Sequence, residues 1–187
     1  MHQTFDYIVV GAGTSGCVLA ARLSERASNN VLLIEAGRDI LPGDEPTDIA
    51  DVYATSYFNK SYFWPGLKAA WRDTGLSGFP QARVFGGGGA VMGMVALRGT
   101  SYDYDEWAQS GARGWDWNGV LPFFRKLEHD WDFTGEMHGD AGPVPIRRLP
   151  REQWPALAQA IEAYGRSHGL PFIADMNAHR LLFTDLF

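Results

Sequence analysis

The sequence predicts an α/β fold that starts with a βαβ unit. Two short apolar runs, Phe5–Val10 and Val31–Ile34, have the composition of strands that are buried on both faces of a parallel sheet. A glycine-rich turn and a helical pattern over Thr14–Arg26 separate these two strands. The strand, turn, helix and second strand complete one crossover, which is right-handed by the usual chirality of such connections.

Each part of this unit has its own local signal. Gly11 stops the first strand, and Asn29 and Asn30 end the helix. The helix carries small and apolar residues that allow it to pack closely on the sheet: Cys17, Val18, Ala20, Ala21 and Leu23. Cys17 is the only cysteine in the chain, so no intrachain disulfide is possible, and we expect its side chain to pack against the sheet.

The turn after the first strand matches the GxGxxG fingerprint of dinucleotide-binding units, in the context that this motif requires. The motif is formed by Gly11, Ala12, Gly13, Thr14, Ser15 and Gly16. Gly11 permits the tight turn, Gly13 lets a pyrophosphate approach the backbone, and Gly16 allows close contact of helix and strand. The helix N-terminus adds N–H donors and the positive end of its dipole.

An acidic residue closes the second strand, where a cofactor ribose would lie. Glu35 and Ala36 follow Ile34, and the Glu35 carboxylate can accept hydrogen bonds from ribose hydroxyls while repelling a 2′-phosphate. This argues against NADP. The fingerprint alone does not separate FAD from NAD, although its place at the chain start and the sequence Glu35-Ala36-Gly37 are similar to flavoprotein βαβ units.

Residues 38–78 lack clear periodicity, contain three prolines and are rich in aromatic residues. We expect an irregular excursion that covers a ligand, with Trp64 either over the cofactor or in the core. A second glycine run follows in the sequence RVFGGGGAVMGMVALRG, residues 83–99, between apolar stretches. Glycines at such a place indicate that the backbone comes close to something.

Further elements are expected beyond this run. Residues 104–108 and 120–128 have helical patterns, the second with Pro122 near its first turn, and residues 143–146 form a brief strand. A helix over residues 153–168 ends at Gly169.

Several blocks in order resemble the glucose-methanol-choline (GMC) oxidoreductases. These blocks are DYIVVGAGTSG, the EAG after the second strand, the second glycine run, DYDEW at residues 103–107, and Gly114-Trp115 followed by VLPFFRKLE. The resemblance covers Phe5 to about Asn177, whereas residues 178–187 do not fit it, as a truncation or a shifted reading frame near Ala178 would explain. It implies a Rossmann-like FAD-binding domain over residues 1–150 and the truncated beginning of a substrate domain over residues 151–187.

The resemblance also implies cofactor contacts in the second glycine run. These would come from Val84, Gly87, Gly88, Met92, Gly93, Met94 and Val95. The chain departs from the family where small hydroxyl residues are frequent (Gly88, Gly89, Ala90) and where Asn is usual (Met92). Some family members link a His covalently to the flavin at the position of Val91, a side chain that cannot form this bond, so the expected FAD is non-covalent.

The implied reaction is the oxidation of a small-molecule alcohol at its CH–OH group, with hydride passing to flavin N5. The family's catalytic base is a C-terminal His that this chain does not contain, so the catalytic residues are unknown. The alternatives are a non-catalytic flavin-binding remnant and an NAD-dependent dehydrogenase, and the second of these is disfavoured because the second glycine run has no role there. An oxidase that uses oxygen and a dehydrogenase that uses another acceptor both fit.

The histidines and the overall composition indicate no further site or partner. His129, His138 and His168 are expected at the surface or at helix caps, and we find neither a metal-ligand cluster nor a Ser-His-Asp arrangement. A net charge of -6 gives no reason to expect a nucleic-acid partner, and no apolar run approaches the length of a membrane span. Without a signal-like N-terminus we expect a cytoplasmic protein, and we predict no oligomeric state.

Overall fold

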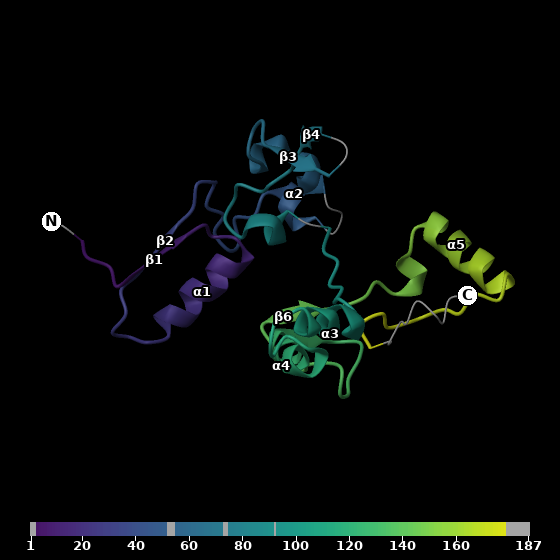
Figure 1. Cartoon of the computed structure of the whole chain (residues 1–187). Coiled ribbons are helices and arrows are strands. Elements are labelled where there is room, and N and C mark those ends of the chain that lie inside the picture. Colours follow the sequence, from purple (N-terminus) through teal and green to yellow (C-terminus); the bar gives the residue numbers. More distant parts are fainter. Residues whose placement is uncertain (1–2, 52–54, 73–74, 92, 179–187) are drawn as a thin grey trace. The chain divides into compact units, whose positions relative to one another are not determined.

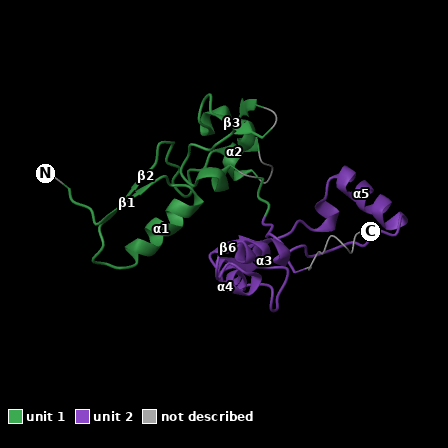
Figure 2. Ribbon diagram, in the orientation of Figure 1, with its two compact units in different colours: residues 1–95 green, residues 96–187 purple. Residues whose placement is uncertain are grey.

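The computed structural model describes residues 3–51, 55–72, 75–91 and 93–178. The chain forms two compact units, residues 1–95 (unit 1) and 96–187 (unit 2), shown in green and purple in Figure 2. Unit 1 begins with the predicted βαβ crossover: β1 (Tyr7–Val10) pairs in parallel with β2 (Val31–Ile34), and α1 (Thr14–Ser24) packs beside both strands (Figure 1). The α/β fold class predicted from the sequence is therefore confirmed.

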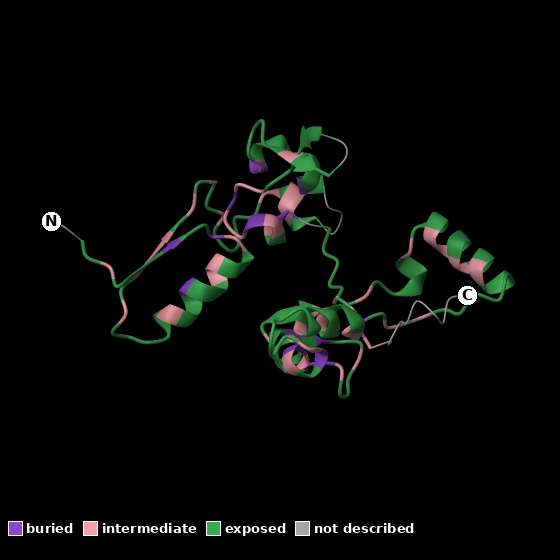
Figure 3. Cartoon of the chain, in the orientation of Figure 1, coloured by how far each residue is buried: buried purple, intermediate pink, exposed green. Residues whose placement is uncertain are grey.

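The burial of this unit differs from the prediction. Of the four residues of β1 only Val9 is buried, whereas Ile8 is 60% exposed and Val10 is 80% exposed. Figure 3 shows that little of the βαβ unit is buried. The expectation of strands buried on both faces was therefore wrong for this chain, because α1 covers one face of a two-stranded sheet and no described element covers the other. The apolar composition of β1 is suited to a larger sheet than the one present.

The predicted irregular excursion contains several short elements. They are α2 (Thr47–Ala50), η1 (Thr55–Phe58), η2 (Lys60–Tyr62) and the antiparallel pair β3 (Lys68–Trp71) and β4 (Gly75–Gly78). Tyr62, Val84 and Val91 form a buried apolar cluster that joins this region to the second glycine run. The aromatic residues of the excursion thus supply part of the core of unit 1 as well as exposed surface.

Unit 2 contains two helices that are linked through Asp105. α3 (Ser101–Gln109) begins with a capping box between Thr100 and Asp103. α4 (Trp117–Leu127) starts three residues before the predicted Val120, because Asp116 caps it by accepting a hydrogen bond from the Gly119 amide. Pro122 consequently lies in the second turn of α4 rather than the first. The Asp105 side chain accepts a hydrogen bond from the Trp117 amide.

The rest of unit 2 consists of a small parallel sheet and a terminal helix. β5 (Glu128–Asp130) pairs with β6 (Val144–Ile146), which confirms the brief predicted strand. After η4 (Arg151–Gln153), α5 (Ala156–Ser167) ends as predicted at Gly169, whose φ is +74°. Hydrogen bonds from Leu170 N to Gly165 O and from Gly169 N to Arg166 O form a Schellman motif.

No helix among the described residues has both the length and the apolar character needed to cross a bilayer. The predicted division at residue 150 concerns cofactor and substrate parts rather than compactness, and it stays a prediction. The division into compact units falls earlier, between Val95 and Ala96.

Candidate cofactor site

The first glycine turn has the geometry that the fingerprint predicts. Gly11 has a φ of +95°, and its amide donates to Ile34 O at 2.7 Å, which ties the turn to the end of β2. A Cβ on Gly16 would collide with the carbonyl oxygen of Gly11, so only glycine allows α1 to pack this closely on the turn. Gly13 is the N-cap of α1 and places no side chain over the first turn.

Glu35 holds this turn from the end of β2. Its Oε2 atom accepts a hydrogen bond from the Ala12 amide at 2.8 Å, and its Oε1 atom accepts one from the Gly37 amide at 2.8 Å. The sequence suggested a ribose-binding role for Glu35 but did not reveal this structural one. Each carboxylate oxygen can accept more than one hydrogen bond, so the two roles are compatible.

The second glycine run lies against the first turn. The Gly86 amide donates to Ala12 O at 2.7 Å, and Gly13 and Gly86 form a parallel bridge. Gly87 has a φ of +60°, and a Cβ there would lie 2.7 Å from the Gly13 Cα atom. The close backbone approach predicted for these glycines is therefore made to the other glycine turn, a pairing that has no local signal in the sequence.

These two segments and the first helix line one groove of about 900 Å³. Eleven predicted cofactor residues lie along it: Gly11, Gly13, Thr14, Ser15, Gly16, Glu35, Ala36, Trp64, Val84, Gly87 and Gly88. Apolar residues of β1 and α1, among them Val10 and Leu19, complete the lining. Residues from three separate parts of the sequence thus share one concave site in unit 1.

Three of the remaining predicted contacts, Gly93, Met94 and Val95, are exposed and do not line this groove, and Met92 lies outside the described residues. Met94 has a φ of +53°, a left-handed conformation that is uncommon for a side chain of this kind. Such strained residues occur often at ligand-binding segments, and this one lies where cofactor contact is predicted.

Trp64 occupies the edge of the groove rather than the core. Its side chain is partly exposed, and the Arg83 guanidinium lies 5.4 Å from the centre of its ring.

Nearby, the buried Tyr62 hydroxyl donates to Asp48 Oδ1 at 3.0 Å, and Asn59 donates to Asp48 Oδ2 at 2.8 Å. The Asn59 hydrogen bond lowers the pKa of Asp48, whereas burial raises the pKa of Tyr62, so an ionised Asp48 holds a neutral phenol.

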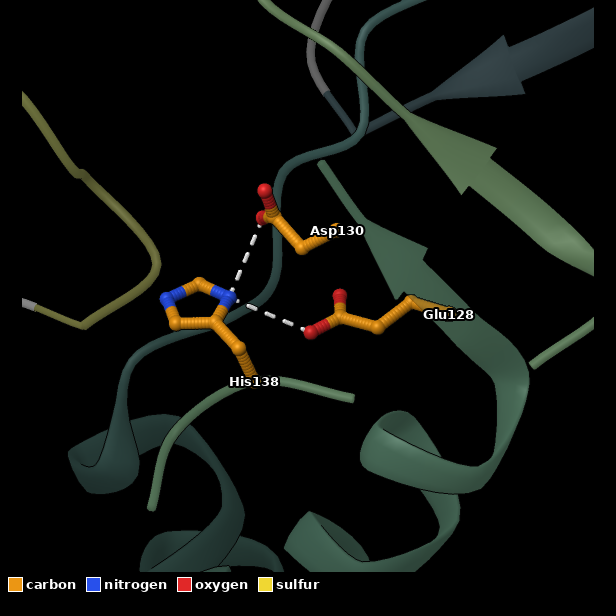
Figure 4. A group of neighbouring side chains, drawn as sticks. All are labelled: Glu128, Asp130 and His138. Carbon is orange, nitrogen blue, oxygen red and sulfur yellow. Dashed lines mark hydrogen bonds and ion pairs between the residues drawn. The ribbon is translucent and has the colours of Figure 1, made fainter. Parts of the chain in front are cut away.

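One prediction about the histidines was wrong. His138, expected at the surface or a cap, is buried in unit 2 between carboxylates, because the HGDAG turn folds back on β5. Glu128, Asp130 and His138 present potential ligand atoms within 4.8 Å of one another (Figure 4). His129 is exposed, and His168 caps α5 through the Tyr164 carbonyl, as expected.

Comparison with known proteins identifies the family. The profile of the family described as GMC oxidoreductase matches residues 5–181. The chain belongs to the GMC oxidoreductase family. Its resemblance to that family, carried by the two glycine runs and the later blocks, is thereby confirmed.

Relatives of this GMC chain include proteins that are named as oxidoreductases. It is 45% identical to a 5-(hydroxymethyl)furfural oxidase of Methylovorus sp., a match that covers 93% of this chain and 35% of the relative. It is 37% identical to an oxygen-dependent choline dehydrogenase of Vibrio vulnificus, over 96% of this chain and 32% of the relative. The chain therefore spans about a third of the length of the curated relatives it matches.

Solved structures agree with the fold. Pyridoxine 4-oxidase from Mesorbium loti superimposes with a TM-score of 0.75 at 34% identity, covering 90% of this GMC chain and 33% of the oxidase. An FAD-dependent oxidoreductase from Chaetomium thermophilum gives a TM-score of 0.79 at 32% identity, covering 94% and 31% of the two chains. The family and these neighbours support a flavin cofactor.

Proposed function

We propose that this chain is the FAD-binding part of an oxidoreductase that oxidises the CH–OH group of a small alcohol. The observation that carries the proposal is the joining of the two glycine runs beside the N-terminus of α1, along one groove. When bound, FAD would supply the hydride acceptor at its N5 atom. The names of the relatives, which include a 5-(hydroxymethyl)furfural oxidase and a choline dehydrogenase, support a small alcohol as the substrate class.

The groove fits the pyrophosphate and ribose of such a cofactor. No side chain caps the N-terminus of α1, so its first-turn amides and helix dipole are available to an anion. Gly13 leaves open space beside them, since a Cβ there would meet only Gly87, at 3.9 Å. Glu35 at the end of β2 offers its remaining lone pairs to ribose hydroxyls and would repel a 2′-phosphate.

The flavin ring would be held by backbone rather than by side chains. The segment Gly93–Val95 carries no hydroxyl or amide side chain, so its main-chain N–H groups are its available donors. Donors of this kind stabilise the negative charge that develops on a reduced flavin. Trp64, at the groove edge, would shield the bound cofactor from water.

The chain would hold FAD without a covalent bond. Val91 stands where some family members carry the flavin-linked residue, and its side chain is 1% exposed and packs with Tyr62 and Val84. It therefore contributes to the core of unit 1 and offers no nucleophile. We assign no catalytic base among the described histidines, because His138 is engaged by carboxylates and His129 and His168 lie outside the groove.

An absorption spectrum tests the proposal. The purified 187-residue chain is incubated with FAD, freed of unbound flavin and examined in the visible range. Flavin absorption bands that are perturbed by the protein and remain after desalting under native conditions would show binding. Release of the flavin on addition of denaturant would support a non-covalent bond. A folded but colourless chain would contradict cofactor binding by these residues.

Two glycine variants sharpen this test. Gly13→Ala adds a methyl group that the protein itself has room for, so the chain should fold normally while FAD affinity falls by about tenfold or more. Gly78→Ala in β4 is the matched control, because it also points into open space but lies away from the groove. Equal FAD affinity in both variants would argue against a pyrophosphate beside Gly13.

A further inference from the structure

Unit 2 contains a buried ionic network centred on His138. The Nδ1 atom of its ring lies 3.2 Å from Glu128 Oε1 and 3.1 Å from Asp130 Oδ2, as Figure 4 shows. The Nε2 atom lies 2.6 Å from Asp175 Oδ2. Carboxylate oxygens therefore face both nitrogens of one ring.

The surroundings of the ring contain charges of both signs. Charged groups from every element packed against His138 face its ring or its backbone. They are Glu128 and Asp130 of β5, Asp175 after α5, Arg98 before α3, Arg125 of α4 and Arg148 after β6. Arg98 pairs with Glu128 at 2.5 Å, and Arg148 donates to both oxygens of Asp130 at 2.7 and 2.9 Å. Arg125 donates to the His138 carbonyl at 3.1 Å.

We propose that His138 is held as a doubly protonated imidazolium and acts as a proton-dependent lock on the fold of unit 2. A neutral ring would direct a lone pair at a carboxylate, either at Asp175 or at the pair Glu128 and Asp130, which is repulsive. With the second proton, the Nε2–H group faces Asp175 and the Nδ1–H group faces Glu128 and Asp130, so each ring nitrogen donates toward a carboxylate. A buried charge is tolerated only when it is paired and hydrogen-bonded in this way.

The same network disfavours a metal ion at this place. A divalent cation would need the lone pair of Nδ1 and free oxygens on Glu128 and Asp130. The Glu128 Oε1 atom already receives Arg98 and the Gly139 amide, and Asp130 receives the Arg148 guanidinium. In the proposed imidazolium, the proton on Nδ1 lies where a metal ion would have to bind.

The network around His138 also fixes residues 175–178 to residues 96–98, which are distant in the sequence. Asp175, held by His138, accepts hydrogen bonds through Oδ1 from the Asn177 amide at 3.0 Å and the Ala178 amide at 3.3 Å. The buried Asn177 side chain then donates to Ala96 O at 2.9 Å and accepts from the Arg98 amide at 3.0 Å. Loss of the ring proton would therefore release residues 175–178 from residues 96–98.

The protonation of His138 does not depend on the cofactor, so the lock is tested on the chain without FAD.

The first test reads the ring directly. In ¹⁵N-labelled chain at pH 7.5, long-range ¹H–¹⁵N spectra should show both His138 nitrogens protonated, with the His138 signals assigned by their absence from the spectrum of His138→Gln. A neutral His138 pattern at pH 7.5 would overturn the proposal, because it would place the proton on a carboxylate such as Asp175. Tight binding of Zn²⁺ that shifts the His138 signals would also overturn it.

The second test measures the lock. Hydrogen exchange of the Arg98 and Asn177 amides, corrected for the intrinsic effect of pH, should accelerate at least tenfold between pH 7 and pH 9. It should be fast at both pH values in His138→Gln and unchanged in the control His129→Gln. If His138→Gln does not fold, Asp175→Asn serves instead. In that variant the His138 ring should lose its second proton at a lower pH than in the unaltered chain. Exchange that is independent of pH, or an unchanged ring titration in Asp175→Asn, would overturn the proposal.

Discussion

Gly87 and Gly88 are neighbours in sequence but have different reasons to be glycine. A Cβ on Gly87 would meet the Gly13 backbone at 2.7 Å in a left-handed conformation, whereas nothing lies within 4 Å of a Cβ on Gly88. We predict that Gly87→Ala lowers the free energy of unfolding by about 2 kcal/mol and that Gly88→Ala changes it by less than about 0.5 kcal/mol. Urea unfolding of the two variants measures the difference, and equal stabilities would contradict the paired glycine turns.

Glu35 should stabilise the fold even when no cofactor is bound. Because its two oxygens accept the amides of Ala12 and Gly37, Glu35→Gln would set an amide donor against a backbone donor. We predict a loss of about 1 to 3 kcal/mol in the free energy of unfolding without FAD. Glu25→Gln, which removes an exposed pair with Arg22, is the control and should cost under about 1 kcal/mol. An equal effect of the two changes would refute the structural role.

Asp130 gives unit 2 an acid limit. Burial opposes its ionisation, but the Arg148 guanidinium and the amides of Phe133 and Asp132 outweigh burial, so its pKa lies below the ordinary 3.8. A lowered pKa contributes stability that is complete above pH 3.8 and disappears as the pH falls through the lower, folded-state pKa.

The unfolding free energy of unit 2, followed by its tryptophan fluorescence, should therefore drop on acidification below this pH. Asp130→Asn should be less stable by about 1 to 3 kcal/mol at neutral pH, because it leaves the half-buried Arg148 guanidinium with only its longer ion pairs to Asp132 and Asp175, and should show a shallower acid dependence. The exposed Glu136→Gln should keep the full acid dependence. A steep acid loss that persists in Asp130→Asn would assign it to another group.

At the scale of the elements, α5 offers a pair of glycines with opposite expected effects. Gly169 closes the Schellman motif at a φ of +74°, whereas Gly165 lies inside the helix, where an added Cβ would make ordinary contact with Leu170 at 3.8 Å. Gly169→Ala should lower stability by about 1 kcal/mol, and Gly165→Ala should raise it by up to about 1 kcal/mol. Thermal melting followed by circular dichroism distinguishes the signs, and the same sign for both would contradict the observed helix end.

The elements that the sequence predicted well are those with local signals. The βαβ unit follows from two apolar runs and one glycine turn, and the end of α5 follows from Gly169. The start of α4 was misplaced because Asp116, a capping residue outside the apolar pattern, decides it. The pairing of Gly13 with Gly86 and the burial of His138 depend on contacts between distant residues, for which one sequence carries no signal.

At the scale of the whole molecule, the exposed apolar face of the βαβ unit is the feature that most affects behaviour in solution. Ile8 and Val10 of β1 and Val18 of α1 are all more than half exposed, and exposed apolar side chains of this kind promote association. We predict that the chain self-associates in sedimentation experiments as its concentration rises and that Val10→Thr weakens this association while stability changes by less than about 1 kcal/mol. The adjacent Val9, which is 8% exposed, provides the contrast. Val9→Thr should instead lower the free energy of unfolding by about 1 to 3 kcal/mol, because it buries a hydroxyl against α1. If Val10→Thr leaves the association unchanged, this face is not the surface through which the chains meet.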